Sequence, residues 1–161
     1  MPKLLFKEEQ RFKQIWLWVI LIVAAILPLY GIYQQIILGK PFGNNPMSDG
    51  ALIGFTIMLL ILIGLFWFVR LRTEIDENGI RMQFFPLLKK NIQWNEIESA
   101  KIVTYGFIGG WGIRLWTKYG TVYNMKGNRG LAIQLKSGQK FLIGSQKTDE
   151  LQKVLDQLKL A

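Results

Sequence analysis

The residues best suited to chemistry lie in one stretch, Tyr105 to Gly130, which reads YGFIGGWGIRLWTKYGTVYNMKGNRG. Glycines beside a cation can cradle phosphate, but a P-loop needs GxxxxGK[ST] followed by a helix. Here Gly106 is followed five places on by Trp111, and the dinucleotide pattern GxGxxG fails at Leu115. The sequence therefore disfavours a nucleotide site. It favours glycines that serve as turns of a small sheet.

The cations and aromatic residues of the same stretch suggest a second kind of site. Arg114 and Lys118 would share one strand face by period two, and a stacked hairpin would bring further residues beside them. Such a surface binds an anionic lipid head group or an acidic peptide. The alternative interpretation is a solvated sheet face. The candidate surface comprises Trp111, Arg114, Trp116, Lys118, Tyr123, Lys126 and Arg129.

Most catalytic chemistry is excluded by composition. The chain contains no cysteine and no histidine, which removes disulfides, Cys/His metal sites and histidine-dependent triads. Glu96 and Glu98 have the same-face spacing of a strand, and paired carboxylates can act as acid and base. Because no pocket motif accompanies them, we interpret them as surface residues. We expect no catalytic residues, no metal and no cofactor.

Two uncharged apolar runs determine the organisation of the first half of the chain. They predict transmembrane helices at residues 15–38 and 51–69, because about 20 apolar residues of helix cross a bilayer core. A leader at residues 1–14 precedes the first run and carries two glutamates, and no cleavage motif follows that run. The first run is therefore predicted to be a retained membrane anchor and not a signal peptide. We expect this leader to form a short interfacial helix or a frayed tail. Residues 39–50 would form an external loop.

The charges around these runs predict the orientation. The net charge is +9, with four cations in residues 1–14 and fifteen in residues 70–161, whereas the connection between the runs holds Lys40 alone. The positive-inside rule therefore predicts a multi-pass protein of the cytoplasmic (inner) cell membrane, with both termini in the cytoplasm.

Residues 70–161 change to the periodicity of a soluble β domain. Alternating apolar positions separated by turn signals such as Asn78-Gly79 and Ser137-Gly138 predict about seven short antiparallel strands. Thr148 is then the predicted N-cap of an amphipathic helix with Leu151, Val154, Leu155 and Leu158 on one stripe. The predicted fold class is membrane α plus soluble β, with a bent sheet or open barrel closed by the C-terminal helix.

This domain resembles the bacterial pleckstrin-homology-like (PH-like) domain, and the whole chain resembles small two-span membrane proteins that carry it. The resemblance lies in TEIDENGIRMQFFP, IQWNEIES, GGWGIR and YNMKGNRGLAIQLKSGQKFLIGSQKTDELQKVL, behind a KEEQRF leader. It implies binding to lipids, to proteins or to further copies, without catalysis. The first turn is acidic at Asp76-Glu77, so phosphoinositide binding through a basic first hairpin is not implied.

The sequence therefore predicts a non-catalytic, membrane-anchored binding or scaffolding protein at the cytoplasmic membrane surface. Its partners would be the lipid bilayer together with anionic lipid head groups or a membrane protein; homo-oligomers are left open. Nucleic acid is disfavoured because no recognition motif is present. One alternative is an assembly subunit of a larger membrane complex. A second, less favoured alternative is a membrane enzyme.

Overall fold

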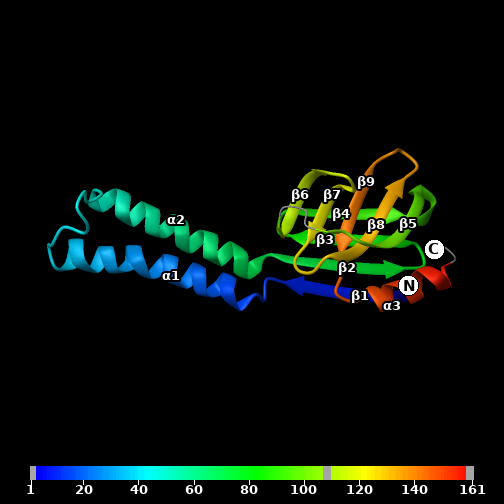
Figure 1. Cartoon of the computed structure of the whole chain (residues 1–161), viewed down its shortest axis with the longest axis horizontal. Coiled ribbons are helices and arrows are strands. Elements are labelled where there is room, and N and C mark those ends of the chain that lie inside the picture. The colour runs from blue at the N-terminus through cyan, green and yellow to red at the C-terminus, as the bar shows by residue number, and fades with distance from the viewer. Residues whose placement is uncertain (1–2, 107–109, 159–161) are drawn as a thin grey trace. The chain divides into compact units, whose positions relative to one another are not determined.

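The computed structural model describes residues 3–106 and 110–158. The chain divides into two compact units (Figure 1). One unit contains Lys13–Phe68, and the other combines Met1–Phe12 with Val69–Ala161. Along the chain, the helical unit is thus an insertion into the β unit.

The helical unit consists of α1 (Ile15–Ile32), a five-residue π-helical turn η1 (Tyr33–Ile37) and α2 (Asp49–Phe68). The apolar stretches Ile15–Ile37 and Asp49–Phe68 are long and apolar enough to cross a membrane, with 23 and 20 residues. They coincide with the two predicted spans to within two residues. Most of the large apolar side chains of these helices are not covered by other parts of the chain.

A narrow stripe of buried residues lies where α1 packs against α2. Leu21, Ala25, Pro28 and Gly31 are the buried residues of α1, at the three- and four-residue spacing of one helix face. Near the start of α1 and the end of α2, the rings of Trp18 and Trp67 meet edge to face, with centroids 5.5 Å apart.

The β unit begins with an antiparallel four-stranded sheet, sheet A, in the order β1-β2-β3-β4. Its strands are β1 (Leu4–Arg11), β2 (Arg70–Asp76), β3 (Gly79–Phe85) and β4 (Leu88–Gln93). The predicted turn after β2 forms, because the Asp76 carboxylate accepts hydrogen bonds from the amides of Asn78 and Gly79 at 2.8 and 3.1 Å.

The leader is a strand of this sheet and not the expected interfacial helix or frayed tail. β1 pairs with β2 from Leu4↔Asp76 to Arg11↔Arg70. Its inward residues are Phe6, Glu8 and Gln10, and two of these are polar, so the sequence shows no apolar alternation. Both polar side chains are satisfied inside the β unit: Glu8 accepts the Ser145 hydroxyl at 2.6 Å, and Gln10 donates to the Gly144 carbonyl at 2.7 Å.

A second sheet, sheet B, has five strands in the order β5-β8-β9-β7-β6. The expectation of a bent antiparallel sheet or open barrel of about seven strands is wrong in its strand pairing: the described strands form two sheets, and β7 pairs with β9 in parallel. Period-two alternation identifies a strand but not its partner, which explains the error. The strands are β5 (Ile97–Thr104), β6 (Gly112–Thr117), β7 (Gly120–Asn124), β8 (Arg129–Leu135) and β9 (Lys140–Gly144).

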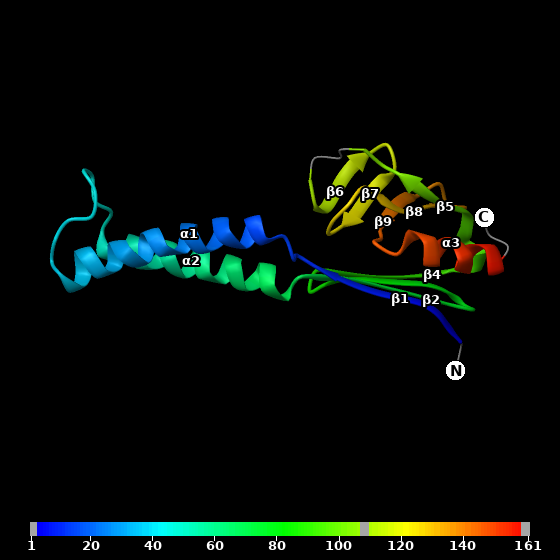
Figure 2. The ribbon, with the colours of Figure 1, turned by 60° about the horizontal axis from the view of Figure 1, so that its bottom comes forward.

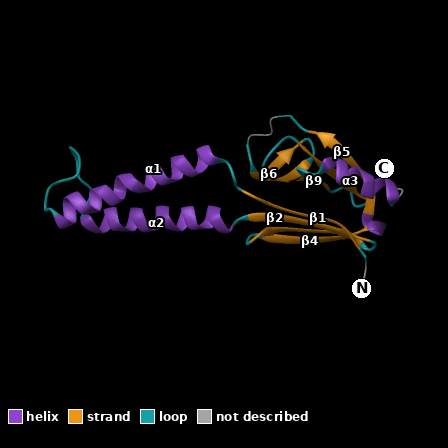
Figure 3. Ribbon diagram, turned by 90° about the horizontal axis from the view of Figure 1, so that it is seen from below, coloured by secondary structure: helices purple, strands orange, loops and turns teal. Residues whose placement is uncertain are grey.

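The two sheets form two layers that enclose one core (Figures 2 and 3). A short 3₁₀ turn, η2 (Trp94–Glu96), leads from sheet A to sheet B. Helix α3 (Thr148–Gln157) packs on β5, β8 and β1 and adds the predicted residues Leu151, Val154 and Leu155 to the core. Lys159 lies outside the described residues.

Candidate functional site

The hairpin of β6 and β7 carries the part of the Tyr105–Gly130 stretch that projects from the domain. Its register runs regularly through Ile113↔Tyr123 and Arg114↔Val122, then shifts before Thr117↔Gly120. The Thr117 hydroxyl donates to the Gly120 carbonyl at 2.8 Å and accepts the Tyr119 amide at 3.1 Å. The register shift therefore falls on Leu115 and Trp116. Beyond these two residues, a hydrogen-bonded turn closes the hairpin.

Trp116 is the clearest outlier of this hairpin. Its φ is 54°, the only positive φ of a non-glycine residue among the described residues, and its side chain is 94% exposed. A left-handed conformation costs an L-residue about 1–2 kcal/mol, and an exposed indole gains little from packing. Leu115 beside it is also 53% exposed. The hairpin thus presents two large apolar side chains to solvent at a cost in folding free energy.

The outer face of sheet B adds a cluster of cations to this hairpin. The strand register aligns Lys101, Ala132, Leu142, Val122 and Arg114 in one row across the sheet. A hollow of ≈ 180 Å³ opens on this face, and we call it the basic hollow. Its polar lining comes from Ser99, Lys101, Lys118, Tyr119, Gln134 and Lys140.

The cations of this face come from different segments of the chain. Lys101 lies on β5, Lys118 lies in the β6–β7 turn and Lys140 begins β9. The Lys118 ammonium lies 5.0 Å from the centroid of the Tyr119 ring, a cation–π contact that fixes it near the hollow. Sequence reasoning found Arg114 and Lys118 but missed Lys101 and Lys140, since only the strand pairing brings these four onto one face. The bulge at Leu115 and Trp116 also removes the period-two argument that linked Arg114 to Lys118.

Three of the predicted surface residues lie elsewhere. Tyr123 is a core residue, only 4% exposed, and burial raises the pKa of its phenol. Its ring packs 6.5 Å from that of Phe84 in sheet A. Arg129 extends toward α3 and lies 3.6 Å from the Asp149 carboxylate. Lys126 is exposed in the β7–β8 loop, where its carbonyl accepts the Gln146 amide at 2.6 Å.

Tyr123 was misassigned because both faces of β7 are covered. Val122 packs with Tyr105 and Leu142 on the outer face, while Tyr123 packs on the inner face. Alternation therefore does not separate a buried from an exposed side in this strand.

Trp111 lies at the open end of the β6–β7 hairpin, and the glycines lie at the turns around it. Gly110, Gly112, Gly120 and Gly127 have positive φ, as expected for turns, and a strand instead of a helix follows them. Trp111 is half-buried beside a hollow that Gly110 and Asn124 also line. A Cβ on Gly110 would lie 2.7 Å from an Arg114 guanidinium nitrogen, so Arg114 packs over this glycine. Gly109 lies outside the described residues.

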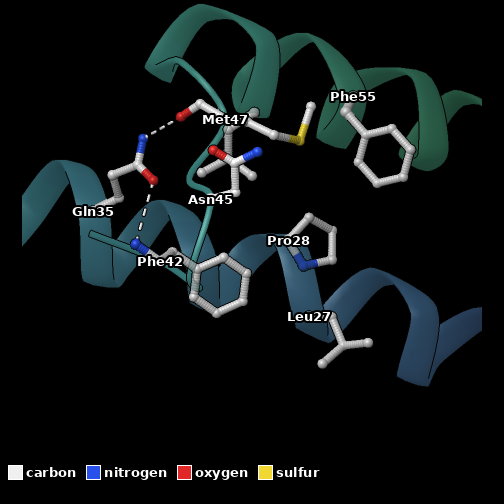
Figure 4. A pocket seen from close by; sticks show the side chains of 8 residues that line it. Leu27, Pro28, Gln35, Phe42, Asn45, Met47 and Phe55 are labelled. Carbon is white, nitrogen blue, oxygen red and sulfur yellow. Dashed lines mark hydrogen bonds between the residues drawn. The ribbon is translucent and has the colours of Figure 1, made fainter. Parts of the chain in front are cut away.

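The helical unit has an apolar hollow of ≈ 290 Å³ beside its interhelical loop (Figure 4). Two amide side chains, those of Gln35 and Asn45, are among its lining residues (Figure 4), and the Gln35 amide is already engaged. Gln35 donates to the Met47 carbonyl and to the Asp49 carboxylate at 2.7 Å each, and accepts the Phe42 amide at 3.4 Å. Gln35 therefore ties the π-turn to the loop and offers no free polar group for recognition.

The carboxylates do not assemble a reactive site in the described part of the chain. Glu96 ends the 3₁₀ turn and accepts the Gln93 amide at 2.8 Å, whereas Glu98 on β5 accepts the Gln134 amide at 2.7 Å. The predicted same-strand pair is thus divided between two elements. No three acidic side chains among the described residues are grouped to hold a metal ion.

Comparison with protein-family models, with curated proteins and with solved structures finds no match for this chain. The class that the fold itself defines is a chain of two apolar helices, each long enough to cross a membrane, joined to a two-sheet β domain with a C-terminal helix.

Proposed function

We propose that the chain is a non-catalytic, membrane-anchored binding or scaffolding protein that carries a PH-like domain at the cytoplasmic face of the cell membrane. The two apolar helices support the anchoring, and the cations that flank them support the orientation. Two facing sheets and a C-terminal helix support the PH-like assignment. The parallel pairing of β7 with β9 departs from the antiparallel pattern that the resemblance implies.

The proposed contact surface is the outer face of sheet B together with the β6–β7 hairpin. The observation that carries this proposal is the exposed, left-handed Trp116. Strained and exposed aromatic residues are uncommon in a well-packed domain, and strain is concentrated at functional positions. Trp is also the residue that most often anchors an interface.

The partner that fits this surface is an acidic protein segment with an apolar anchor. The basic hollow supplies three ammonium groups, from Lys101, Lys118 and Lys140. β6 lies at one end of the strand order of sheet B, so its outer backbone groups are available to a further strand. Charge attraction would guide the partner, and burial of the indole would hold it.

The test replaces Trp116 by a benzophenone-bearing photo-crosslinking amino acid, which keeps a large aromatic side chain at this position, in the full-length chain expressed in its membrane. We expect a discrete protein adduct, and we expect the charge reversals Lys101→Glu and Lys140→Glu to abolish it. The same photo-crosslinker at Lys153, an exposed position of α3, serves as the matched control.

Two results would overturn the proposal. Adducts with lipid alone would assign the hairpin to the bilayer. An adduct pattern at position 116 that matches the pattern at position 153 would reduce Trp116 to an exposed residue without a partner.

A further inference from the structure

The outer face of sheet A, opposite the face that it turns to the core, carries a second set of charges. The strand register arranges them in three rows across β1 to β4. The rows are Arg11, Arg70 and Phe85; Glu9, Arg72, Gln83 and Lys89; and Lys7, Glu74, Arg81 and Asn91. These rows contain six cations and two carboxylates, so the face is strongly positive.

The positive charge is not evenly distributed over this face. In the third row, Glu74 lies 3.1 Å from the Lys7 ammonium and 3.7 Å from the Arg81 guanidinium, and Arg81 also reaches Asp76 at 3.0 Å. Acids therefore balance the cations in that row. In the first two rows, four cations share the single carboxylate of Glu9.

The Glu9 carboxylate forms ion pairs with three arginines. It lies 2.7 Å from a guanidinium nitrogen of Arg11 and of Arg72, and 3.8 Å from Arg70. Hydrogen bonds from Arg72 and then Arg11 lower the pKa of Glu9 to about 2, so this carboxylate is ionised at neutral pH. One negative charge thus faces three arginines. Like charges directly opposite each other, such as Arg11 and Arg70, repel, and Glu9 beside them offsets only one of the three positive charges, so a second anion would be stabilised here.

A hollow beside this cluster has room for that anion. It has a volume of ≈ 210 Å³, and Arg70, Arg72, Gln83 and Phe85 line it. The Arg70 guanidinium lies 4.9 Å from the centroid of the Phe85 ring, which holds the charge in place at the rim. Arg72 uses its Nε and one terminal nitrogen on Glu9, which leaves its other terminal nitrogen for a ligand. Two arginines and an amide form a suitable set of donors for a phosphate group.

Arg70 and Arg11 both lie close in sequence to the ends of the apolar helices. Arg70 follows Phe68, the last residue of α2, by two positions, and Arg11 precedes Ile15, the first residue of α1, by four. Two residues of extended chain span about 7 Å. In a membrane-anchored chain, Arg70 is therefore at most about 7 Å of chain from the end of a membrane-spanning helix, near which the surface potential of anionic lipids attracts cations.

The turn between β3 and β4 belongs to the same end of sheet A. Arg70 is paired with Phe85, and Leu87 in the turn that follows is 60% exposed. An exposed apolar side chain next to arginines is the pattern of a protein surface that lies in the bilayer interface.

We propose that the hollow formed by Arg70, Arg72, Gln83 and Phe85 binds the phosphate of an anionic phospholipid, at the bilayer surface where the two apolar helices end. This inference rests on the membrane anchoring proposed above but not on the partner site of sheet B. The ligand is recognised as a phosphate that is held in the membrane, and a soluble phosphate is the competing source of the same chemistry.

The test uses the full-length chain in neutral detergent, with native mass spectrometry and added phosphatidylglycerol, phosphatidylcholine or inorganic phosphate. We expect retained phosphatidylglycerol, and binding at least about tenfold weaker in the double variant Arg70→Gln with Arg72→Gln. The matched control, Lys136→Gln with Lys153→Gln, also removes two positive charges, at exposed positions outside both surfaces. It is expected to bind phosphatidylglycerol as the parent chain does.

A variant with the opposite expectation guards against misfolding. Glu9→Gln removes the internal anion and leaves the arginines uncompensated, so it is expected to raise the affinity for phosphatidylglycerol several-fold. Equal losses in the arginine and lysine double variants would overturn the proposal, as would a loss in Glu9→Gln. Binding of inorganic phosphate as strong as the binding of phosphatidylglycerol would overturn the assignment to lipid.

The two proposals fail separately. A chain that resists alkaline extraction from membranes but ignores phosphatidylglycerol contradicts the lipid site alone. A chain that extracts as a soluble protein contradicts the anchoring on which both proposals depend.

Discussion

The Glu8 carboxylate accepts a 2.6 Å hydrogen bond from the Ser145 hydroxyl and so joins the first strand of the chain to the segment before α3. Its second oxygen accepts the Gln146 amide at 2.8 Å. Glu8 is only 6% exposed, so its carboxyl oxygens are satisfied by these donors and not by bulk water. The residues before the first apolar helix are therefore a structural part of the β domain.

Glu8→Ala is predicted to destabilise the chain by about 2–3 kcal/mol, because it leaves the buried Ser145 hydroxyl and the part-buried Gln146 backbone amide without this acceptor. The thermal unfolding midpoint in mild detergent should fall by roughly 10 °C. Lys7→Ala is the matched control: Lys7 is the neighbouring residue on the solvent side of β1, and its ion pair with Glu74 is exposed. That control should change stability by about 0.5 kcal/mol or less. Equal shifts in the two variants would contradict the role assigned to Glu8.

The β domain is predicted to fold without the helical unit if β1 is retained. Arg11 and Arg70 are paired, so a two-residue Asn-Gly turn can replace the helical unit, residues 13–68, and close a β1–β2 hairpin. This chain should be soluble, with dispersed amide resonances and slow hydrogen exchange in β2 and β9. Residues 70–161 alone should not reach this state, since they lack Phe6, Glu8 and Gln10. Equivalent spectra from both chains would contradict the two-part domain.

The sequence predicted the apolar helices, most strands and the C-terminal helix because each has a strong local period. It did not predict β1, whose inward residues Glu8 and Gln10 look like solvent-facing ones until their partners near Ser145 are known. The pairing of β7 with β9, and with it the convergence of Lys101, Lys118 and Lys140, is a tertiary property without a local signal. The sequence placed Trp116 and Lys118 on a candidate surface and the structure exposes both side chains, but the period-two argument used for Lys118 fails at the bulge.

Trp116→Asn is predicted to leave the thermal midpoint unchanged or to raise it slightly. Asn tolerates a positive φ, so the variant removes about 1 kcal/mol of backbone strain and loses little packing. The same variant should lose affinity for the partner of sheet B. Trp94→Ala is the contrasting variant, because the Trp94 indole donates to the Asp76 carbonyl at 3.0 Å. It should lower the midpoint, and a similar drop in Trp116→Asn would show that Trp116 is a packing residue.

The pH dependence of stability should reveal the arginine cluster. The pKa of Glu9 falls from an ordinary value of 4.5 to about 2 in the folded chain. A carboxyl group with a lowered pKa stabilises the fold fully above its unfolded pKa and loses that contribution as the pH falls through the folded pKa. The thermal midpoint of the parent chain should therefore drop more steeply between about pH 4.5 and pH 2 than that of Glu9→Gln. High salt should shrink the difference, and parallel pH profiles at low salt would contradict the cluster.

Membrane anchoring, with the β domain on the cytoplasmic side, underlies both proposed sites, and the lack of cysteine makes it directly measurable. Single substitutions Asn44→Cys, between α1 and α2, and Lys153→Cys, on α3, place one thiol in each unit of the full-length chain. A membrane-impermeant maleimide should label position 44 in intact bacterial cells and position 153 only after permeabilisation. Labelling of position 153 in intact cells, or recovery of the chain in the soluble fraction, would contradict the account.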